Sequence, residues 1–312
     1  MSNRLSSQQI NDFIESQKAA WPLAADNFKA LDGVRVKNVE LPGWTVKVQF
    51  NPARIVSSGA KVDAKTIRER KCFLCEANRP AEQQGIDWGG RYTVLVNPFP
   101  IFPRHLTIPD KSHTDQLIAG RIADMARLAA DLNEYTIFYN GPRCGASAPD
   151  HMHFQAGNSD FLTLAPALED CELKTIATDG ESVLALADSL PLRVFVIDAY
   201  SPEAAQRLFD RLYRAMPVPE GEREPMMNLL CYATAAGVRL VVIPRKRHRP
   251  SFYGTEGEGT MLLSPASVDM GGVFITPLEK DFDALDAETV IRVFDELCLN
   301  ADEINRIASD VE

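Results

Sequence analysis

Two histidines and a glutamine alternate within residues 150–155, which read Asp-His-Met-His-Phe-Gln. On a β-strand, residues i and i+2 point to the same face, so His151, His153 and Gln155 are expected to form one row. A neutral imidazole is a competent nucleophile towards phosphorus, and the phosphoramidate that it forms can be transferred to another oxygen. The alternative is that these are ordinary polar residues of a strand. The spacing and the loop that precedes it favour a site.

That loop is rich in small residues and hydrogen-bond donors. Asn140 and Gly141 come first, and residues 144–147 follow as Cys-Gly-Ala-Ser. Small residues such as Gly145 let main-chain N–H groups approach a phosphate, and the Asn140 amide and the Ser147 hydroxyl add side-chain donors. Phosphoryl transfer needs such donors around the charge that develops on the phosphoryl oxygens. The alternative is a plain glycine-containing turn.

A second group of residues matches a metal site. Cys72 and Cys75 form a Cys-x-x-Cys pair, and His113 and His151 supply two nitrogen ligands from the same half of the chain. A closed set of two thiolates and two imidazoles suits a structural Zn²⁺. The alternative is a redox dithiol or two ordinary buried cysteines. No thioredoxin-like pattern surrounds the pair, so zinc is favoured.

Basic residues are concentrated at 245–249, which read Arg-Lys-Arg-His-Arg. In a chain of net charge −10, Arg245 and Lys246 fit the binding of an acceptor phosphate or a distal phosphate chain. The alternative is a solvated turn, which is the commoner role of charge runs. A polar loop after residue 50 offers Arg54 or Lys61 to a nucleotide.

Composition excludes several classes of protein. The net charge of −10 argues against a broad nucleic-acid surface, although a local basic cluster can still bind a small anion. The polar N-terminus lacks the apolar core of a signal peptide, and no window approaches the ~18–20 apolar residues of a membrane span. Six cysteines in 312 residues are typical of a reduced chain. A cytoplasmic protein with no nucleic-acid or membrane partner is expected.

Hydrophobic periodicity predicts an α+β fold. A helix is expected over the first ~30 residues, with Ile10, Phe13 and Ile14 at helical spacing before Pro22. Further helices are expected at 114–134 and 202–216. Strands are expected at 44–50, 92–96, 106–108, 135–139, 192–198, 227–233 and 238–243.

The second part of the chain repeats the order of the first. Residues 106–113 and 241–248 both contain an apolar triplet, a proline, a polar triplet with a basic residue and a histidine. An internal duplication is therefore plausible, with a boundary in the charged stretch 170–181. This gives a catalytic half at 1–175 and a second half at 176–312 that lacks the histidine pair.

Together the motifs resemble the histidine-triad superfamily. The resemblance is carried by residues 96–109 (Val-Asn-Pro-Phe-Pro-Ile-Phe-Pro-Arg-His-Leu-Thr-Ile-Pro), by His113 and by residues 140–155. Hydrolases of the superfamily usually have His where this chain has Gln155. The His-x-His-x-Gln order resembles the transferase branch, which includes galactose-1-phosphate uridylyltransferase, diadenosine tetraphosphate phosphorylase and GDP-hexose phosphorylase. The resemblance implies an antiparallel sheet with helices, in two related halves of which the second is degenerate.

The resemblance also implies a role for each matching residue. His153 matches the nucleophile, which carries a covalent nucleotide, and Gln155 matches the residue that hydrogen-bonds the phosphoryl group. His151 matches a zinc ligand of the uridylyltransferase, together with Cys72, Cys75 and His113. The remaining matches lie near the nucleotide: Asn140 and Ser147 at the phosphate, Asn97 beside the nucleoside and His105 lining the phosphate site.

One departure keeps the substrate open. The segment between Ser147 and His151 is one residue longer here than in the uridylyltransferase. The expected function is a nucleotidyltransferase or phosphorylase acting on a nucleoside diphosphate-sugar or a dinucleoside polyphosphate, with a sugar phosphate or inorganic phosphate as second substrate. The alternatives are a nucleotide hydrolase and a zinc-stabilised nucleotide-binding protein without turnover. The base, the acceptor and the oligomeric state stay open, with a homodimer as one option.

Overall fold

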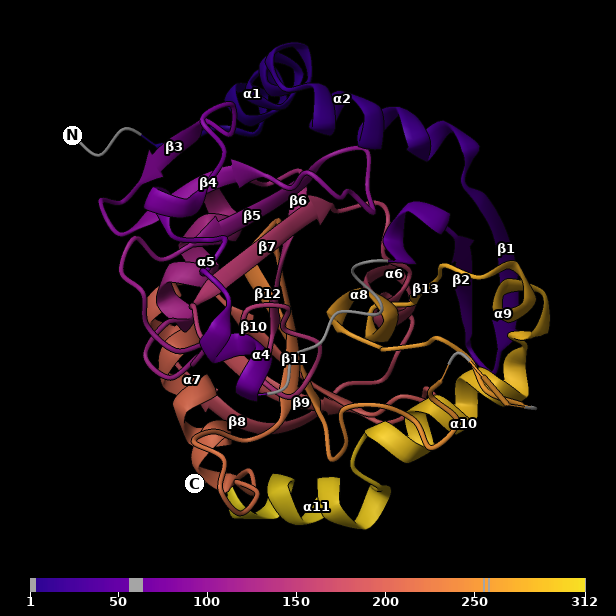
Figure 1. Cartoon of the computed structure of the whole chain (residues 1–312). Coiled ribbons are helices and arrows are strands. Elements are labelled where there is room, and N and C mark those ends of the chain that lie inside the picture. Colours follow the sequence, from indigo (N-terminus) through magenta and orange to yellow (C-terminus); the bar gives the residue numbers. More distant parts are fainter. Residues whose placement is uncertain (1–3, 56–63, 255, 258, 312) are drawn as a thin grey trace.

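A ten-stranded antiparallel sheet dominates the computed structural model, which describes residues 4–55, 64–254, 256–257 and 259–311 (Figure 1). Each strand pairs antiparallel with its neighbour. The strands, in their order across the sheet, are β3 (Gly85–Trp88), β4 (Tyr92–Val96), β5 (His105–Pro109), β7 (His153–Asn158), β6 (Tyr135–Asn140), β11 (Met227–Thr234), β12 (Gly237–Pro244), β10 (Val194–Ala199), β9 (Ser182–Ala187) and β8 (Lys174–Asp179).

A smaller sheet of three strands faces one side of the large one. Its strands are β1 (Arg35–Leu41), β2 (Trp44–Phe50) and β13 (Val273–Thr276). β1 and β2 form an antiparallel hairpin, and β13 pairs parallel to β2 although more than 200 residues separate them. This pairing brings the C-terminal segment against the N-terminal hairpin.

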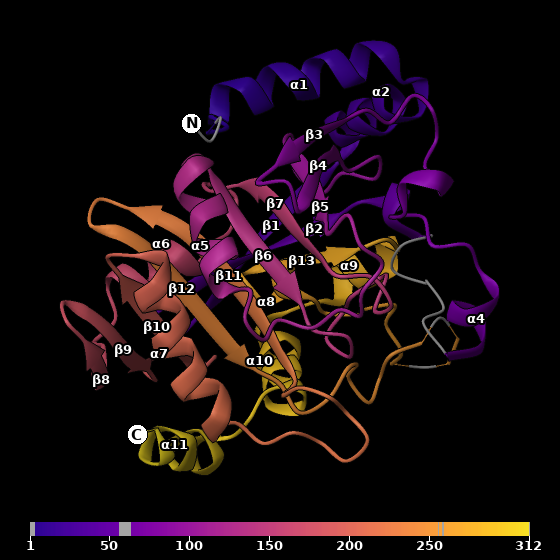
Figure 2. The ribbon, with the colours of Figure 1, turned by 90° about the vertical axis from the view of Figure 1, so that its left-hand side faces the viewer.

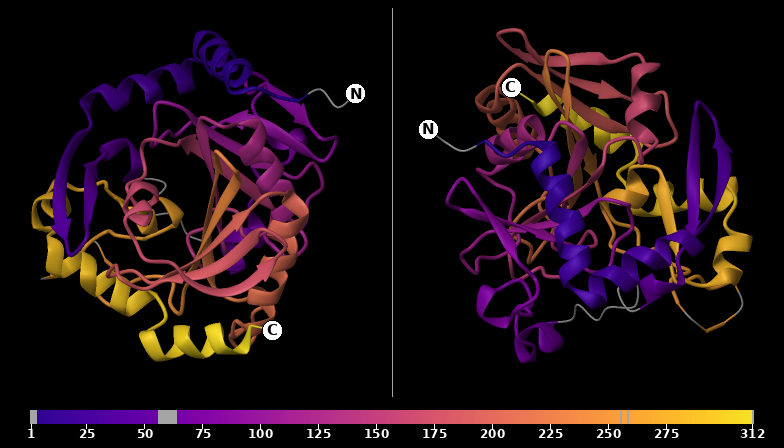
Figure 3. Two further views of the ribbon diagram at one scale, coloured as in Figure 1. Left: turned by 180° about the vertical axis from the view of Figure 1, so that it is seen from behind. Right: turned by 90° about the horizontal axis from the view of Figure 1, so that it is seen from above.

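Helices surround both sheets (Figures 1, 2 and 3). None within the described ranges is long and apolar enough to cross a membrane. The helices are α1 (Ser7–Ala20), α2 (Pro22–Lys29), α4 (Ala64–Glu69), α5 (Ile122–Asp131), α6 (Leu164–Glu169), α7 (Pro202–Ala215), α8 (Ser267–Met270), α9 (Glu279–Ala284), α10 (Ala287–Leu297) and α11 (Ala301–Asp310), with 3₁₀ turns η1 (Ala30–Gly33), η2 (Pro52–Arg54) and η3 (Glu76–Asn78).

The two faces of the ten-stranded sheet bury separate hydrophobic cores. Alternate strand residues such as Phe154 and Leu229 pack with α5, α7 and α11 on one face. The residues between them, such as Phe138 and Leu230, pack with the three-stranded sheet and α10 on the other. Because both faces are covered, the strands read as continuous apolar runs rather than as alternating ones.

The order of the strands confirms an α+β fold made of two related halves. Read from its outer edge, the first half runs β3-β4-β5-β7-β6 and the second runs β8-β9-β10-β12-β11. In each half a helix, α5 or α7, connects the third strand to the strand that ends at the centre. The halves join where β6 pairs with β11. The expected division at 175/176 falls inside β8, so separate domains remain a prediction.

The repeat was aligned wrongly from sequence. Residues 106–108 lie on β5, whereas 241–243 lie on β12, whose counterpart in the first half is β7. A short apolar triplet followed by proline occurs at the end of either strand, so the pattern could not tell them apart.

Two predicted strands, 44–50 and 92–96, have the observed bounds, but two helices differ. The first is split because Pro22 begins α2 after α1 ends at Ala20. The helix expected at 114–134 extends only over Ile122–Asp131. Residues 114–121 have apolar spacing suited to a helix, but their main chain instead bonds to the loop at 149–152.

Truncation of Leu230 tests the junction of the halves. Leu230 is 1% exposed and stands opposite Phe138 in the β6–β11 ladder. Leu230→Ala should lower the free energy of unfolding by about 2–5 kcal/mol, because a buried leucine leaves a cavity. Leu23→Ala on α2, where the side chain is 45% exposed, should change it by less than about 0.5 kcal/mol. Denaturant titration measures both, and equal effects would contradict the assigned packing.

Candidate functional site

The predicted site residues converge at one end of the ten-stranded sheet, on the face towards the three-stranded sheet. His153 and Gln155 lie on β7, and His105 lies on the adjacent β5. Phe154, between the two β7 residues, points into the opposite core. The His105 ring lies 5.1 Å from that of Phe102 and 6.0 Å from that of Phe138, in the core shared with β2.

His153 is 2% exposed and held in one tautomer. Its Nδ1 lies 2.8 Å from the main-chain oxygen of His151 and must donate to it, because a carbonyl only accepts. Burial lowers the pKa of His153 to about 4, so the ring is neutral near pH 7. The lone pair is therefore on Nε2, the nitrogen that a nucleophile needs free.

The amide of Gln155 is oriented by His105. The main-chain N–H of Ile101 donates to Nδ1 of His105 at 3.1 Å, so the proton of the neutral ring is on Nε2. Burial, with a contribution from the Arg54 charge, lowers the pKa of His105 to about 3. Nε2 donates to Oε1 of Gln155 at 3.1 Å. The NH₂ group of Gln155 is thereby left as a donor.

Cys72, Cys75, His113 and His151 come together as the sequence predicts, with their ligand atoms within 4.8 Å of one another. Nε2 of His151 donates to the main-chain oxygen of Asp110 at 2.7 Å, so Nδ1 presents its lone pair to Cys72 Sγ at 3.3 Å. Nδ1 of His113 lies 3.2 Å from Cys75 Sγ. Two sulfurs and two ring nitrogens in this arrangement suit a tetrahedral metal ion.

The expected single row of three side chains is wrong for His151. β7 begins at His153, so His151 lies before the strand. The main-chain N–H of Met152 donates to the oxygen of Thr114 instead of joining the β5 ladder. The chain is therefore bent between the two histidines, and His151 faces the cysteines while His153 and Gln155 share a face of the sheet.

Asn140 is engaged by residues of the second half. Its Oδ1 accepts from the N–H of Ser267 at 2.8 Å and from Nδ2 of Asn228 at 3.0 Å. Asn228 in turn accepts from Nη1 of Arg245 at 2.5 Å. The NH₂ group of Asn140 is left to face a ligand.

The basic segment reaches the site, but not as an open cluster. Arg245 is 3% exposed and also donates to the main-chain oxygens of Arg247 and His248 at 3.1 Å. Its guanidinium therefore shapes the turn, while its Nε is buried without a partner. Lys246 is exposed.

Three other residues expected to contact the nucleotide differ in their surroundings. Gly145 has φ +97°, and a Cβ there would lie 2.5 Å from that of Ala266, so glycine is required by close packing. Ser147 is exposed. Asn97 donates to Thr107 Oγ1 at 3.0 Å, beside His105.

Arg54 borders the site from the other sheet. Its Nη1 donates to the main-chain oxygen of Phe99 at 2.6 Å, and its charge acts on His105. The alternative expected with it, Lys61, lies outside the described residues.

Sequence reasoning missed the polar residues that the smaller sheet contributes. Gln49 and Asn51, at the end of β2, are 3% and 2% exposed, and Gln49 Oε1 and Asn51 Nδ2 have no partner. Asp269 on α8 accepts from the N–H groups of Ala266 and Ile275, and burial raises its pKa to about 6. No motif marks these isolated polar residues. The only sequence signal for such a residue is an amide side chain at the end of a strand whose other residues are largely apolar.

Comparison with known proteins agrees with this geometry. Residues 13–158 match the family described as domain of unknown function (DUF4922), and residues 169–311 match the GDPGP1-like C-terminal domain. The yeast Ap4A phosphorylase Apa2 in complex with AMP has a similar structure, with a TM-score of 0.58, 18% identity and coverage of 89% of this chain and 94% of that one. At this identity the likeness shows a common fold, which is the fold expected from the sequence.

Two further solved structures match the chain. The Ap4A complex of Apa2 gives a TM-score of 0.58 at 17% identity, covering 90% of this chain and 97% of that one. An ADP-glucose phosphorylase from Arabidopsis thaliana with bound ADP-glucose gives 0.41 at 14% identity, covering 86% and 99%. No curated protein has a matching sequence.

Glu224 gives a pH-dependent test of the region behind the site. It is 3% exposed and accepts from the Tyr139 hydroxyl at 2.5 Å and from the N–H of Ile118 at 2.8 Å. Burial raises its pKa to about 7, from an ordinary value near 4.5. A raised carboxyl pKa contributes stability that is complete below about pH 4.5 and lost as pH rises through about 7.

The melting temperature of the wild type, relative to Glu224→Gln, should therefore fall between pH 5 and pH 8. The glutamine variant is the matched control, since it keeps the shape without the titration. Thermal unfolding at both pH values measures the difference. A constant difference would contradict the raised pKa.

Proposed function

We propose that the protein is a nucleotidyltransferase of the phosphorylase type. His153 Nε2 attacks the α-phosphorus of a nucleoside diphosphate-sugar or a dinucleoside polyphosphate. The N–P bond forms as the P–O bond to the leaving phosphate or sugar phosphate breaks. An oxygen of inorganic phosphate or of a sugar phosphate then attacks the same phosphorus, and the N–P bond breaks to restore the histidine.

The hydrogen bond from His153 Nδ1–H to the main-chain oxygen of His151 carries the proposal. It leaves Nε2 with the lone pair in a ring that burial keeps neutral. The ring develops positive charge on Nδ1–H as Nε2 bonds phosphorus, and the carbonyl stabilises that charge. The NH₂ groups of Gln155 and Asn140 are available to phosphoryl oxygens, because the oxygen of each amide is already engaged.

The likeness in fold to an Ap4A phosphorylase supports the same reaction class. Gln155, in place of the histidine usual in hydrolases of the superfamily, favours transfer to phosphate over transfer to water. Arg54 and Arg245 each interact electrostatically with the buried Asp269, so they supply positive charge at this side of the site.

Trapping of the intermediate tests the mechanism. Wild-type protein incubated with radiolabelled ADP-, GDP- and UDP-linked substrates should retain an acid-labile nucleotidyl label. His153→Ala should lose the label because no Nε2 remains, whereas His248→Ala should keep it. A label that persists in His153→Ala would falsify the assignment.

The same incubation separates the alternatives. Added inorganic phosphate should change the product from a nucleoside monophosphate to a diphosphate. A product that stays a monophosphate would identify a hydrolase. Calorimetric binding with neither product nor label would identify a nucleotide-binding protein without turnover.

We also propose that the Cys72, Cys75, His113 and His151 set holds a structural Zn²⁺. A zinc ion in this set would tie the segment around Cys72 to the loop that precedes β7. Metal analysis should find about one zinc per wild-type chain, because a complete four-ligand set occupies a single ion. Cys72→Ser should lose the metal and melt at a lower temperature. Cys171→Ser is the matched control, since Cys171 bonds to the Ala167 oxygen away from the set. Metal-free wild type would end the claim.

A further inference from the structure

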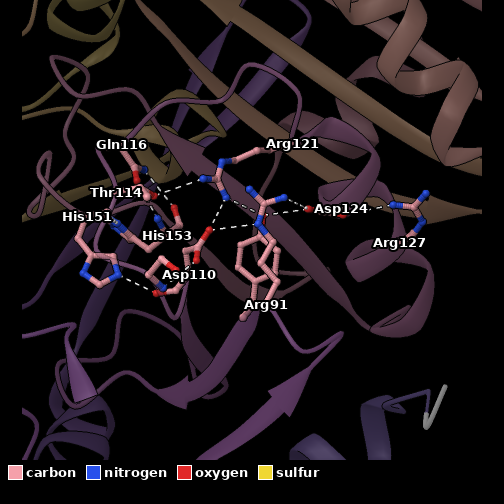
Figure 4. Close-up of polar contacts among 11 residues, drawn as sticks. Arg91, Asp110, Thr114, Gln116, Arg121, Asp124, Arg127, His151 and His153 are labelled. Carbon is pink, nitrogen blue, oxygen red and sulfur yellow. Dashed lines mark hydrogen bonds and ion pairs between the residues drawn. The ribbon is translucent and has the colours of Figure 1, made fainter. Parts of the chain in front are cut away.

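The segment at 110–116 runs beside the chain that enters β7 (Figure 4). The N–H of Asp110 donates to the oxygen of Met152 at 2.9 Å, and the N–H of Met152 donates to the oxygen of Thr114 at 2.6 Å. The N–H of Gln116 donates to the oxygen of Pro149 at 3.1 Å. Main-chain hydrogen bonds thus hold residues 149–152. The main-chain groups of His153, in contrast, bond to a side chain.

The side chain of Gln116 engages both main-chain groups of His153. Its Oε1 accepts from the N–H of His153 at 2.8 Å, and its Nε2 donates to the oxygen of His153 at 3.0 Å. The same Nε2 donates to the oxygen of Asn140 at 3.0 Å. Gln116 is completely buried, so water cannot replace these bonds.

The sheet geometry explains why a side chain is needed here. Main-chain groups of an antiparallel strand alternate between its two neighbours. Because Asp110 bonds to Met152, the groups of His153 face β6 rather than β5. The β6–β7 ladder, however, ends at Phe138↔Gln155. Without Gln116, the N–H and C=O of His153 would be buried without partners, which costs about 1–3 kcal/mol for each group.

The backbone that carries Gln116 is itself braced. Nη1 of Arg121 donates to the Asp110 carboxylate at 2.6 Å, and Nη2 donates to Thr114 Oγ1 at 3.3 Å (Figure 4). Asp110 and Arg121 are 4% and 9% exposed, so this ion pair is shielded from water. The Tyr139 hydroxyl, which donates to Glu224, lies 3.2 Å from the main-chain oxygen of Gln116.

We propose that Gln116 is a positioning residue for the nucleophile. It replaces the missing strand partner of His153 and so fixes where Nε2 lies relative to the phosphorus. The inference rests on the proposed role of His153. It also explains how His153 stays in place where β6 and β7 no longer pair.

Two substitutions distinguish positioning from space filling. Gln116→Met keeps the length of the side chain but makes none of the three hydrogen bonds. Gln116→Glu keeps the acceptor for the His153 N–H but loses the NH₂ group, and a carboxyl group donates to at most one of the oxygens of His153 and Asn140. If Gln116 only fills space, Met should be tolerated. If it positions His153, both variants should slow nucleotidyl transfer.

The test measures the rate of label transfer in a single turnover, using whichever ADP-, GDP- or UDP-linked substrate labels the wild type. Both variants should slow it by about 10–100-fold, since a displacement of about 1 Å can cost 10²-fold, while nucleotide affinity stays near the wild-type value. Hydrogen–deuterium exchange of a peptide that contains His153 should rise in Gln116→Met. Gln206→Met is the matched control, because Gln206 lies on α7 and accepts from the N–H of Ala123 at the start of α5, not from His153.

Each outcome decides the inference. Slower labelling with retained affinity and faster exchange, in the Gln116 variants but not in Gln206→Met, supports it. Wild-type rate and exchange in Gln116→Met overturn it. If Gln116→Met does not fold, a wild-type rate in Gln116→Glu overturns it. If wild-type protein takes no label, the proposed function fails, and the exchange result alone decides whether Gln116 holds His153.

Discussion

The pairing of β6 with β11 determines how the rest of the molecule is arranged. It joins two five-stranded halves of the same strand order into one sheet. The register Asn228↔Asn140 places the start of β11 at the site end of β6, and β12 ends beside it at Pro244. Arg245 therefore arrives next to Asn140 although about 100 residues separate them. The second half, which lacks the histidine pair, thus supplies side chains that hold Asn140 in place.

Main-chain carbonyls decide the chemistry of the histidines. The oxygen of His151 takes the Nδ1 proton of His153, and the oxygen of Asp110 takes the Nε2 proton of His151. Two neighbouring rings consequently present opposite nitrogens, one suited to phosphorus and the other to a metal. A carbonyl oxygen only accepts hydrogen bonds, whereas a hydroxyl group can donate or accept. The main chain alone therefore fixes which ring nitrogen carries the proton in each histidine.

The second half of the duplicated fold differs from the first in the strand that corresponds to β7. Strand order makes β12 the counterpart of β7, and β12 carries neither a histidine nor a glutamine. Its residues Val238, Leu240 and Val242 pack in the core with α5 and α7, so this strand is structural. The second half keeps the sheet and the crossover helix, because these depend on apolar periodicity and not on the histidines.

The sequence by itself determined which residues to expect in the candidate site. The spacing of two in His151–His153–Gln155 and the Cys-x-x-Cys pair are local patterns, and apolar runs such as 92–96 define strands without tertiary information. Tertiary structure alone decided the rest. Gln116, Asn228 and Asp269 are single polar residues whose partners lie far away in sequence. The helix expected at 114–134 begins only at Ile122 for this reason, since the main chain of Thr114 and Gln116 bonds to the loop before β7. Local propensity cannot register a partner supplied by another part of the chain.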